Sequence, residues 1–250
     1  MNIRETLNSE FSKQHLNTVM TDDALERYVR IAEGYAEIEN VLAVLSDLHT
    51  NKSYVIHGSF SDIVDVDKER YSGYIPSIWE DDIFKAINSD DLEMKMLQEL
   101  LFFHYISRCS KSRRFNHCLI QRLRMRSRNG EWIETLHRLY YIPAQDGKTI
   151  RFALCLYGAM TTNLKADAVV IDMLTGETIK LNKPTGIKIL SPQEISVLKL
   201  IDEGNRSKGI ADILGISLHT VSRHRQNIIA KLKVRNSAEA CKIARTLSIL

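Results

Sequence analysis

The sequence predicts an α+β chain in which an antiparallel sheet with helices precedes a compact all-α domain. Three observations support this prediction. β-rich runs flank a helical segment in the first part of the chain, Asn129-Gly130 separates two of those runs, and four short helices with clear caps fit into the last sixty or so residues. At 250 residues the chain is long enough for two domains.

Alternation and helical periodicity predict the helices and strands of the part of the chain before residue 182. Residues 1–37 are expected to form a helical lead-in, in which a loosely patterned start precedes a helix over Asp22–Tyr35 with its apolar residues along one side. A second helix is expected over Asp90–Arg108, and Thr175-Gly176 indicates a late hairpin. The expected strands are Asn40–Leu48, Ser53–His57, Leu119–Arg128, Glu131–Tyr141 and Arg151–Tyr157.

One of these strands has arginine at alternate positions, so four cations share one face. We expect that face to be solvated and paired with acids such as Glu131, although an anionic ligand or the DNA backbone is an alternative. The arginines are Arg122, Arg124, Arg126 and Arg128. The opposite face is expected to form core or to line a pocket, with Leu119, Leu123, Met125, Trp132, Leu136 and Tyr140.

Two strings in this half resemble PAS domains. Residues 56–64 look like the PAS segment in which a strand passes through Gly58 into a short helix, and residues 87–92 resemble its hydrophobic-His-Pro-Asp-Asp string. Two strands, a helical middle and three antiparallel strands is also the PAS order. The resemblance implies a PAS-like sensor or dimerisation domain over 38–181, with its trailing hairpin, before a linker at 182–188.

No cofactor is predicted for this half. A lone helical histidine such as His104 is usually structural and seldom a haem ligand. The four cysteines, Cys109, Cys118, Cys155 and Cys241, form no Cys-x-x-Cys pair, so reduced, buried thiols are expected rather than disulfides or a metal site.

Caps define the helices of residues 189–250. Ser191, Pro192 and Glu194 form a capping-box pattern, so a helix is expected to begin at Pro192 and to end near Gly204. A second helix should span Ser207 to Leu214 and stop at Gly215. Only a short turn then precedes the next cap, Ser217, which is the spacing of a helix-turn-helix.

The third helix has a buried stripe and a polar outer face. Residues spaced by three or four form the stripe, namely Val221, His224, Ile228 and Leu232, so Ser222, Arg223 and Gln226 point outward. Donors for base edges on an exposed helix suit a DNA major groove. An ordinary solvated face is the alternative, but caps, turn and outer face all agree with the DNA interpretation.

Residues 190–240 resemble the DNA-binding domain of LuxR/NarL transcription regulators. The matching positions are Leu190, Ser191, Glu194, Ile210, Ala211, Thr220, Val221, His224, Asn227, Ile228, Lys231, Leu232, Val234, Asn236, Glu239 and Ala240. Gly209 and Ser222 depart from the family's usual Glu and Lys. Gly209 should weaken its helix by up to about 1 kcal/mol.

The resemblance implies a double-stranded DNA partner and assigns the contacts. Bases would be contacted by Ser222, Arg223 and Gln226. Phosphates would be contacted by Lys208, Thr220, Arg225, Asn227 and Lys231. His224 lies on the inward stripe, so a neutral, hydrogen-bonded core histidine is expected.

A fourth helix should open at Ser237. It carries Ala240, Ile243, Ala244 and Leu247 on one face. The family pairs through such a helix, which implies a homodimer, but the same face can close a small core, and both roles are compatible.

Charge is distributed in agreement with this interpretation. From Lys188 onward there are eleven Lys plus Arg and five Asp plus Glu, a net charge of +6, whereas the whole chain carries +3. The preceding residues are therefore net acidic. The sequence predicts phosphate-dominated, salt-sensitive binding by the basic domain.

No catalytic motif and no membrane span are present. The sequence has no Gly-x-Ser-x-Gly, phosphate-binding loop or His-Glu-x-x-His, and no apolar signal core, so a cytoplasmic protein without catalytic residues is expected. A phospho-receiver does not fit, because only 24 residues separate Asp23 from Asp47.

The sequence therefore predicts a one-component transcription regulator whose PAS-like domain senses a small molecule or mediates dimerisation. The alternative is a partner-gated regulator whose first domain is a protein-interaction module without ligand. A ligand-modifying enzyme tethered to DNA is a third hypothesis.

Overall fold

The computed structural model describes residues 3–12, 22–67, 73–110, 112–147, 149–161, 164, 166–179, 190–232, 234–246 and 250. The chain divides into two compact units, Glu10–Lys180 and Leu181–Leu250, the second grouped with Met1–Ser9. The linker predicted at 182–188 lies outside the described residues. Among the helices of the described ranges, none has the length and apolar character that crossing a membrane demands.

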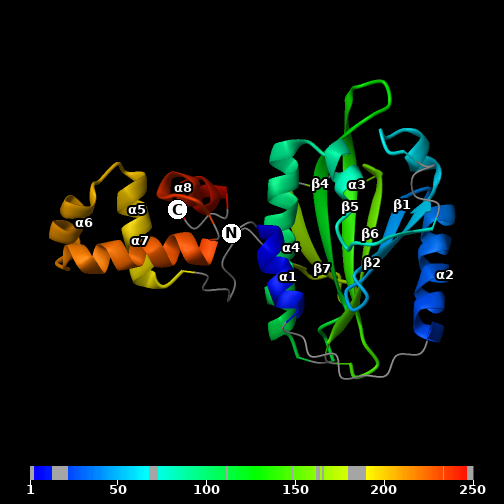
Figure 1. The fold of residues 1–250 in the computed structure, drawn as a ribbon, viewed down its shortest axis with the longest axis horizontal. Coiled ribbons are helices and arrows are strands. Elements are labelled where there is room, and N and C mark those ends of the chain that lie inside the picture. The colour runs from blue at the N-terminus through cyan, green and yellow to red at the C-terminus, as the bar shows by residue number, and fades with distance from the viewer. Residues whose placement is uncertain are drawn as a thin grey trace. The chain divides into compact units, whose positions relative to one another are not determined.

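An antiparallel sheet forms the first unit (Figure 1). Its described strands lie in the order β3-β2-β1-β6-β5-β4-β7-β8, and all the pairings between them are antiparallel, as predicted. The strands are β1 (Leu42–Asp47), β2 (Lys52–His57), β3 (Tyr74–Ile75), β4 (His117–Arg126), β5 (Trp132–Pro143), β6 (Ile150–Ala159), β7 (Ala168–Asp172) and β8 (Thr178–Ile179). The hairpins at Asn129-Gly130 and Thr175-Gly176 are confirmed as β4–β5 and β7–β8.

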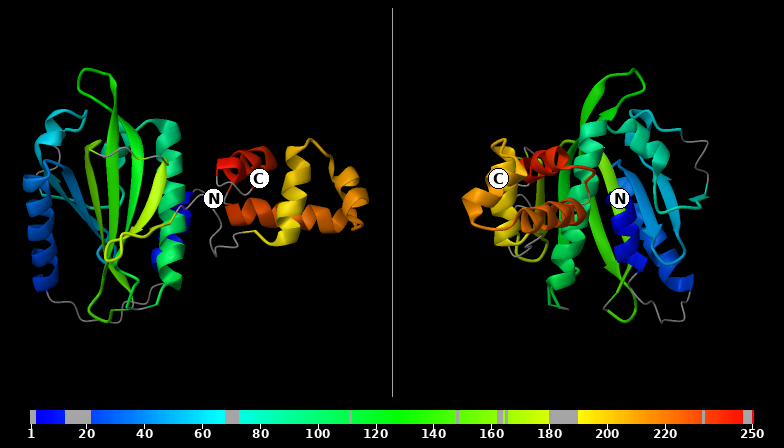
Figure 2. Two further views of the ribbon diagram at one scale, coloured as in Figure 1. Left: turned by 180° about the vertical axis from the view of Figure 1, so that it is seen from behind. Right: turned by 60° about the vertical axis from the view of Figure 1, so that its left-hand side comes forward.

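Helices cover both faces of this sheet (Figures 1 and 2). On one side lies α2 (Asp22–Ile38), whose Ala32 and Ala36 pack in a buried cluster with Leu45, Phe152 and Leu156. The other side is covered by α4 (Ser89–Arg108), with the short helix α3 (Asp81–Ala86) near its start. A further helix, α1 (Ile3–Ser12), ends with Phe11 packed edge-on against Phe103 of α4, at 5.3 Å between ring centroids.

The face predicted for the β5 residues is wrong, because the register of β5 against β4 differs by one residue from the predicted one. Residues directly opposite one another in an antiparallel pair share a face, and Leu136 lies opposite Arg122. Trp132, Leu136 and Tyr140 are therefore on the arginine face, and Trp132 is 51% exposed. The face of Leu119, Leu123 and Met125, all buried as predicted, instead receives the odd-numbered β5 residues Ile133, Thr135, His137, Leu139 and Tyr141.

Two of the four arginines on this face, Arg122 and Arg124, are paired with acids as predicted, but with other partners than Glu131. Arg122 Nη2 lies 2.7 Å from Asp167 Oδ1, and Arg124 donates to both oxygens of Asp91 at 2.8 Å. Because Asp91 lies in the first turn of α4, this second pair links the helix to β4. Glu131 does not appear among the ion-pair partners of these arginines in the described part of the chain.

The two PAS-like strings mark places where the backbone approaches another segment. A Cβ on Gly58, between β2 and the short 3-10 helix Ser59–Asp62, would lie 2.3 Å from the carbonyl oxygen of Ala36. At the second string, Asn88 caps α4 by accepting from the N–H of Asp90 at 3.1 Å, and its own N–H donates to the Arg124 carbonyl at 2.9 Å. The first string therefore sets the approach of the segment after β2 to α2, and the second joins the start of α4 to β4.

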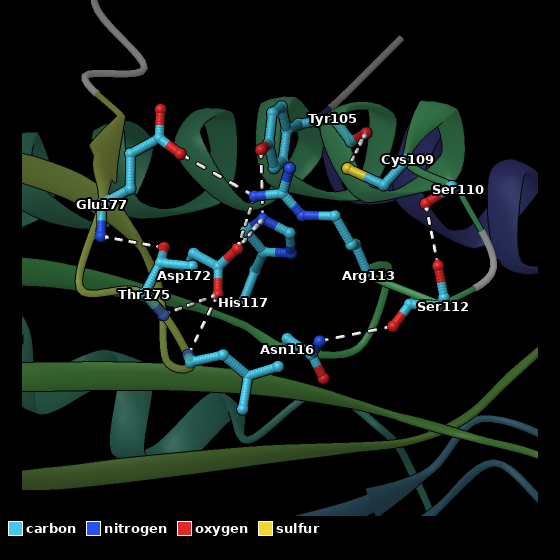
Figure 3. A network of polar contacts seen from close by, with 11 residues as sticks. Tyr105, Cys109, Ser110, Ser112, Arg113, Asn116, His117, Asp172, Thr175 and Glu177 are labelled. Carbon is cyan, nitrogen blue, oxygen red and sulfur yellow. Dashed lines mark hydrogen bonds and ion pairs between the residues drawn. The ribbon is translucent and has the colours of Figure 1, made fainter.

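A polar network joins the end of α4, the start of β4 and the β7–β8 turn (Figure 3). Asp172 accepts from Arg113 Nη2 at 2.7 Å and from the Leu174 N–H at 3.0 Å. The hydrogen bond from Arg113, followed by those from the turn backbone, lowers the pKa of Asp172 below its ordinary value. Tyr105 Oη lies 3.1 Å from His117 Nε2 beside this pair. The network fastens the last strands of the sheet to α4.

Candidate nucleic-acid interface

Four short helices with the predicted caps are described in the second unit. They are α5 (Pro192–Asp202), α6 (Ser207–Leu214), α7 (Leu218–Leu232) and α8 (Ser237–Thr246). The capping box is confirmed, because Ser191 Oγ accepts from the Glu194 N–H at 3.3 Å and Glu194 Oε2 accepts from the Ser191 N–H at 2.6 Å. Gly215 ends α6 with a φ of 64°, the left-handed conformation that glycine adopts readily.

The turn between α6 and α7 is short and capped. Ser217 Oγ accepts from the Thr220 N–H at 3.0 Å, so Ser217 caps α7 as predicted. A small apolar core holds the helices at this turn. Its buried members are Leu190, Val197, Leu198, Ile210, Ala211, Val221, Ile228, Leu232, Val234, Ala240, Cys241 and Ala244.

The helix α7 presents the predicted residues to solvent. Ser222, Arg223 and Gln226 are exposed, whereas Val221 and Ile228 are buried in the core. No Asp or Glu occurs in α7, so its outer face carries only positive and neutral side chains. The exposure of these residues is confirmed, and their contact with bases is a proposal.

An exposed leucine at the start of α7 was not predicted. Leu218 is 53% exposed and begins the helix, four residues before Ser222 and eight before Gln226. Positions spaced by four residues lie on one side of a helix, so Leu218 shares the face of the predicted base contacts. This spacing is visible in the sequence once Ser217 is accepted as the cap.

The residues predicted to contact phosphates have different surroundings. Lys208 is exposed. Thr220, Arg225 and Asn227 are half-buried, and Arg225 Nη1 donates to Ser207 Oγ of α6 at 3.3 Å. Thr220 Oγ1 lies 2.8 Å from the Ser217 hydroxyl.

Lys231 is held in an ion pair across the core. Its Nζ donates to both carboxylate oxygens of Glu194, at 2.8 and 2.7 Å, and thereby links α7 to the start of α5. Burial alone raises the pKa of Glu194, but hydrogen bonds from Lys231 and Ser191 outweigh it and leave that pKa below its ordinary value. An ammonium group has three donors, so the ion pair with Glu194 uses two of the three N–H groups of Lys231.

His224 lies on the inner stripe but differs from the expected hydrogen-bonded histidine. It is half-buried, and its Nδ1 is buried without a hydrogen-bond partner among the described residues. The hydrogen bond expected for a core histidine is therefore not found at this atom.

The residues proposed for dimerisation are divided by their burial. Ala240 and Ala244 have 0% exposure and belong to the core of their own domain, in agreement with the core-closing role of α8. Ile243 is half-buried against that core, and Leu247 lies outside the described residues. Arg245 Nη2, 2.6 Å from Asp202 Oδ1, ties α8 to α5.

Comparison with known proteins agrees with this geometry. Residues 188–244 match the family described as bacterial regulatory proteins, luxR family. Over 68 residues, 27% of this chain, the sequence is 35% identical to the oxygen regulatory protein NreC of Staphylococcus haemolyticus. Over 75 residues, 30% of this chain, it is 36% identical to the transcriptional regulatory protein MctR of Rhizobium johnstonii.

The chain spans about a third of the length of these curated relatives, 30% of NreC and 33% of MctR. Both are named as regulatory proteins and neither as an enzyme. The C-terminal part of this chain is a LuxR-family helix-turn-helix domain, the kind of domain that binds DNA.

Two solved structures resemble the chain over most of its length, but weakly. VqmA of Vibrio cholerae is 13% identical with a TM-score of 0.34, covering 90% of this chain and 88% of VqmA. SdiA of Escherichia coli is 14% identical with a TM-score of 0.30, covering 98% of this chain and 97% of SdiA.

Proposed function

We propose that the protein is a transcription regulator that places α7 in the major groove of duplex DNA. The observation that carries this proposal is the outer face of α7, where Ser222, Arg223 and Gln226 are exposed on a helix without acidic residues. Arginine and glutamine donate to base edges in the major groove, and serine donates or accepts there. Lys208, Thr220, Arg225, Asn227 and Lys231 then hold the flanking phosphates.

Leu218 adds an apolar group to this face. It stands at the start of α7, the end of a recognition helix that contacts bases. An exposed leucine there is suited to contact a thymine methyl group, which only the major groove displays. The interface we propose thus combines hydrogen-bond donors with one apolar contact.

The first unit acts, in this proposal, as a PAS-like sensor or dimerisation domain. Two strands, a helical segment and three longer antiparallel strands support the resemblance, as do the close approach at Gly58 and the cap at Asn88. Two copies of the chain then present their recognition helices about 34 Å apart, one turn of DNA. Regulation by a protein partner is the alternative for this unit.

Salt-dependent binding tests the proposal. The full chain is titrated into a fluorescent random-sequence duplex at several salt concentrations, and anisotropy gives the affinity. We expect log affinity to fall linearly with log salt, and Lys208→Ala to reduce the slope by about 1. Lys199→Ala, an exposed lysine of α5 outside the proposed interface, is the matched control and should keep the slope. The proposal is contradicted if the affinity does not depend on salt concentration, or if both variants lower the slope of log affinity against log salt equally.

A further inference from the structure

Three metal-ligating side chains meet inside the first unit. Glu99 comes from α4, His137 from β5 and Cys155 from β6, and one ligand atom of each lies within 4.8 Å of the others. All three are buried, with exposures of 7%, 0% and 6%. In the part of the chain that the structure describes, this is the one group of three such residues.

Strand register brings the two sheet residues together. His137 lies directly opposite Tyr157 on β6, and Cys155 is two residues from Tyr157 on the same face. Diagonal neighbours of this kind are within side-chain reach. Glu99 approaches from α4, the helix that covers this face of the sheet.

His137 is oriented as a ligand. Its Nδ1 lies 2.6 Å from Gln121 Oε1, while the Gln121 Nε2 donates to Gln98 Oε1 at 2.7 Å. The Gln121 Nε2 also donates to the Lys95 backbone carbonyl, which can only accept, at 3.3 Å, so the amide oxygen faces the imidazole and Nδ1 carries the proton. Nε2 is left with a lone pair, buried and without a partner among the described residues. A histidine that ligates a metal typically donates its other N–H in this way.

We propose that Glu99, His137 and Cys155 form a zinc site in the core of the sheet unit. Thiolate, imidazole and carboxylate together are ligands that Zn²⁺ accepts, and three protein ligands leave a fourth position for water or a small ligand. Zinc bonds of about 2.0–2.3 Å put ligand atoms roughly 3.3–3.8 Å apart in a tetrahedron. Because the ligand atoms lie within 4.8 Å of one another, metal binding requires them to approach by up to about an ångström.

Zinc binding changes no oxidation state and releases one proton. Zn²⁺ forms bonds to Nε2 of His137, to a carboxylate oxygen of Glu99 and to the sulfur of Cys155, and the thiol proton leaves to solvent. Affinity therefore rises with pH.

The positive charge of Lys95 lies next to the proposed site and repels a metal cation. Its Nζ donates to Glu99 Oε1 at 2.7 Å, and the side chain is fully buried. Burial raises the pKa of the Glu80 carboxyl to about 7, and Glu80 accepts from the Tyr157 hydroxyl at 3.3 Å. When it is ionised, Glu80 supplies a second negative charge to the same cluster. The thiolate, both carboxylates, Lys95 and Zn²⁺ then sum to zero, which an apolar interior requires.

Cobalt titration of the untagged, chelator-stripped full chain tests the site. Co²⁺ replaces Zn²⁺ in such sites and absorbs in the near ultraviolet when it is bound to a thiolate. We expect one Co²⁺ per chain with this absorption, displaced by one equivalent of Zn²⁺. Cys155→Ser should abolish the absorption. Cys118→Ser, an equally buried strand cysteine on the opposite face, should retain it.

A variant outside the three ligands separates binding from folding. Gln121→Leu keeps every ligand but removes the acceptor that orients His137, and should weaken cobalt affinity tenfold or more. Circular dichroism checks that each variant is folded. The proposal is overturned if the wild-type chain shows no thiolate–cobalt absorption at saturation, if Cys155→Ser retains it, or if Gln121→Leu binds as tightly as wild type.

Discussion

At the scale of single residues, Gly58 shows where a side chain is excluded. A Cβ there would lie 2.3 Å from one carbonyl oxygen and 2.4 Å from another. We expect Gly58→Ala to lower the free energy of unfolding of the first unit by about 1–3 kcal/mol, the usual range for overpacking. Both tryptophans, Trp79 and Trp132, belong to this unit, so their fluorescence in a urea titration reports its unfolding.

A second glycine provides the control. Gly34 lies inside α2, and a Cβ there would meet nothing within 4 Å. Gly34→Ala should raise the free energy of unfolding by about 0.5–1 kcal/mol, because alanine loses less conformational entropy in a helix. Equal effects of the two substitutions would show that the close approach at Gly58 is not what selects glycine.

Lys231 combines two roles in one side chain. Lys231→Ala leaves the carboxylate of Glu194, 3% exposed, without its cation. Because Lys231 itself is 44% exposed, we expect a moderate loss of about 1–2 kcal/mol in the free energy of unfolding of the second unit. Hydrogen exchange of the α5 and α7 amides measures it. The loss should shrink in the Glu194→Gln background; an unchanged loss would mean that the ion pair contributes nothing.

Sequence reasoning at this scale succeeded where a residue's exposure follows from a local pattern. Ser222, Arg223 and Gln226 are exposed because helical spacing alone puts them opposite Val221 and Ile228. It failed for His137 and Cys155, which lie in different strands. Their approach depends on strand register, which no local pattern in either strand specifies.

At the scale of elements, the β4–β5 hairpin shows how one residue changes a face. A two-residue turn at Asn129-Gly130 would put Leu136 opposite Leu123. The structure instead has a three-residue turn, closed by the Ser127 N–H donating to the Glu131 carbonyl at 2.8 Å, with Gly130 at a φ of 84°. The pairing shifts by one residue, so Leu136 faces Arg122 and His137 turns into the core.

The start of α5 makes the second unit sensitive to acid. The pKa of Glu194 lies below its ordinary value of 4.5 in the folded chain. Its stabilisation is therefore complete above pH 4.5 and is lost as pH falls through the folded pKa. We expect protection of the α5 amides from hydrogen exchange to fall below pH 4.5 in the wild type and to change less in Glu194→Gln. Parallel pH profiles for the two proteins would exclude this cause.

At the scale of the whole molecule, the proposed function requires two copies of the chain on DNA. The helices of the second unit, its short turn and the antiparallel hairpins were predictable, because caps, periodicity and hairpin signals are local. The helices α1 and α3 and the strand β3 were not predicted. Assembly is not local. Because Ala240 and Ala244 are buried in their own domain, any pairing of two copies through α8 would use the other residues of this helix.

Native mass spectrometry of the full chain tests assembly and sensing together. We expect a dimer, and additional mass that is lost on denaturation if the first unit retains a ligand. A bare dimer would favour the partner-gated alternative for that unit. A monomer that stays monomeric with duplex DNA would contradict the two-copy arrangement.

The central claim is that α7 reads base sequence, and selection from a random duplex library tests it most directly. The wild-type chain should enrich a motif of two inverted half-sites with centres about one helical turn apart. Arg223→Ala should lose preference at one position of each half-site, at a cost of about 1–3 kcal/mol for that base, whereas Lys208→Ala should enrich the same motif with lower affinity. No enriched motif, or an unchanged motif with Arg223→Ala, would contradict the claim.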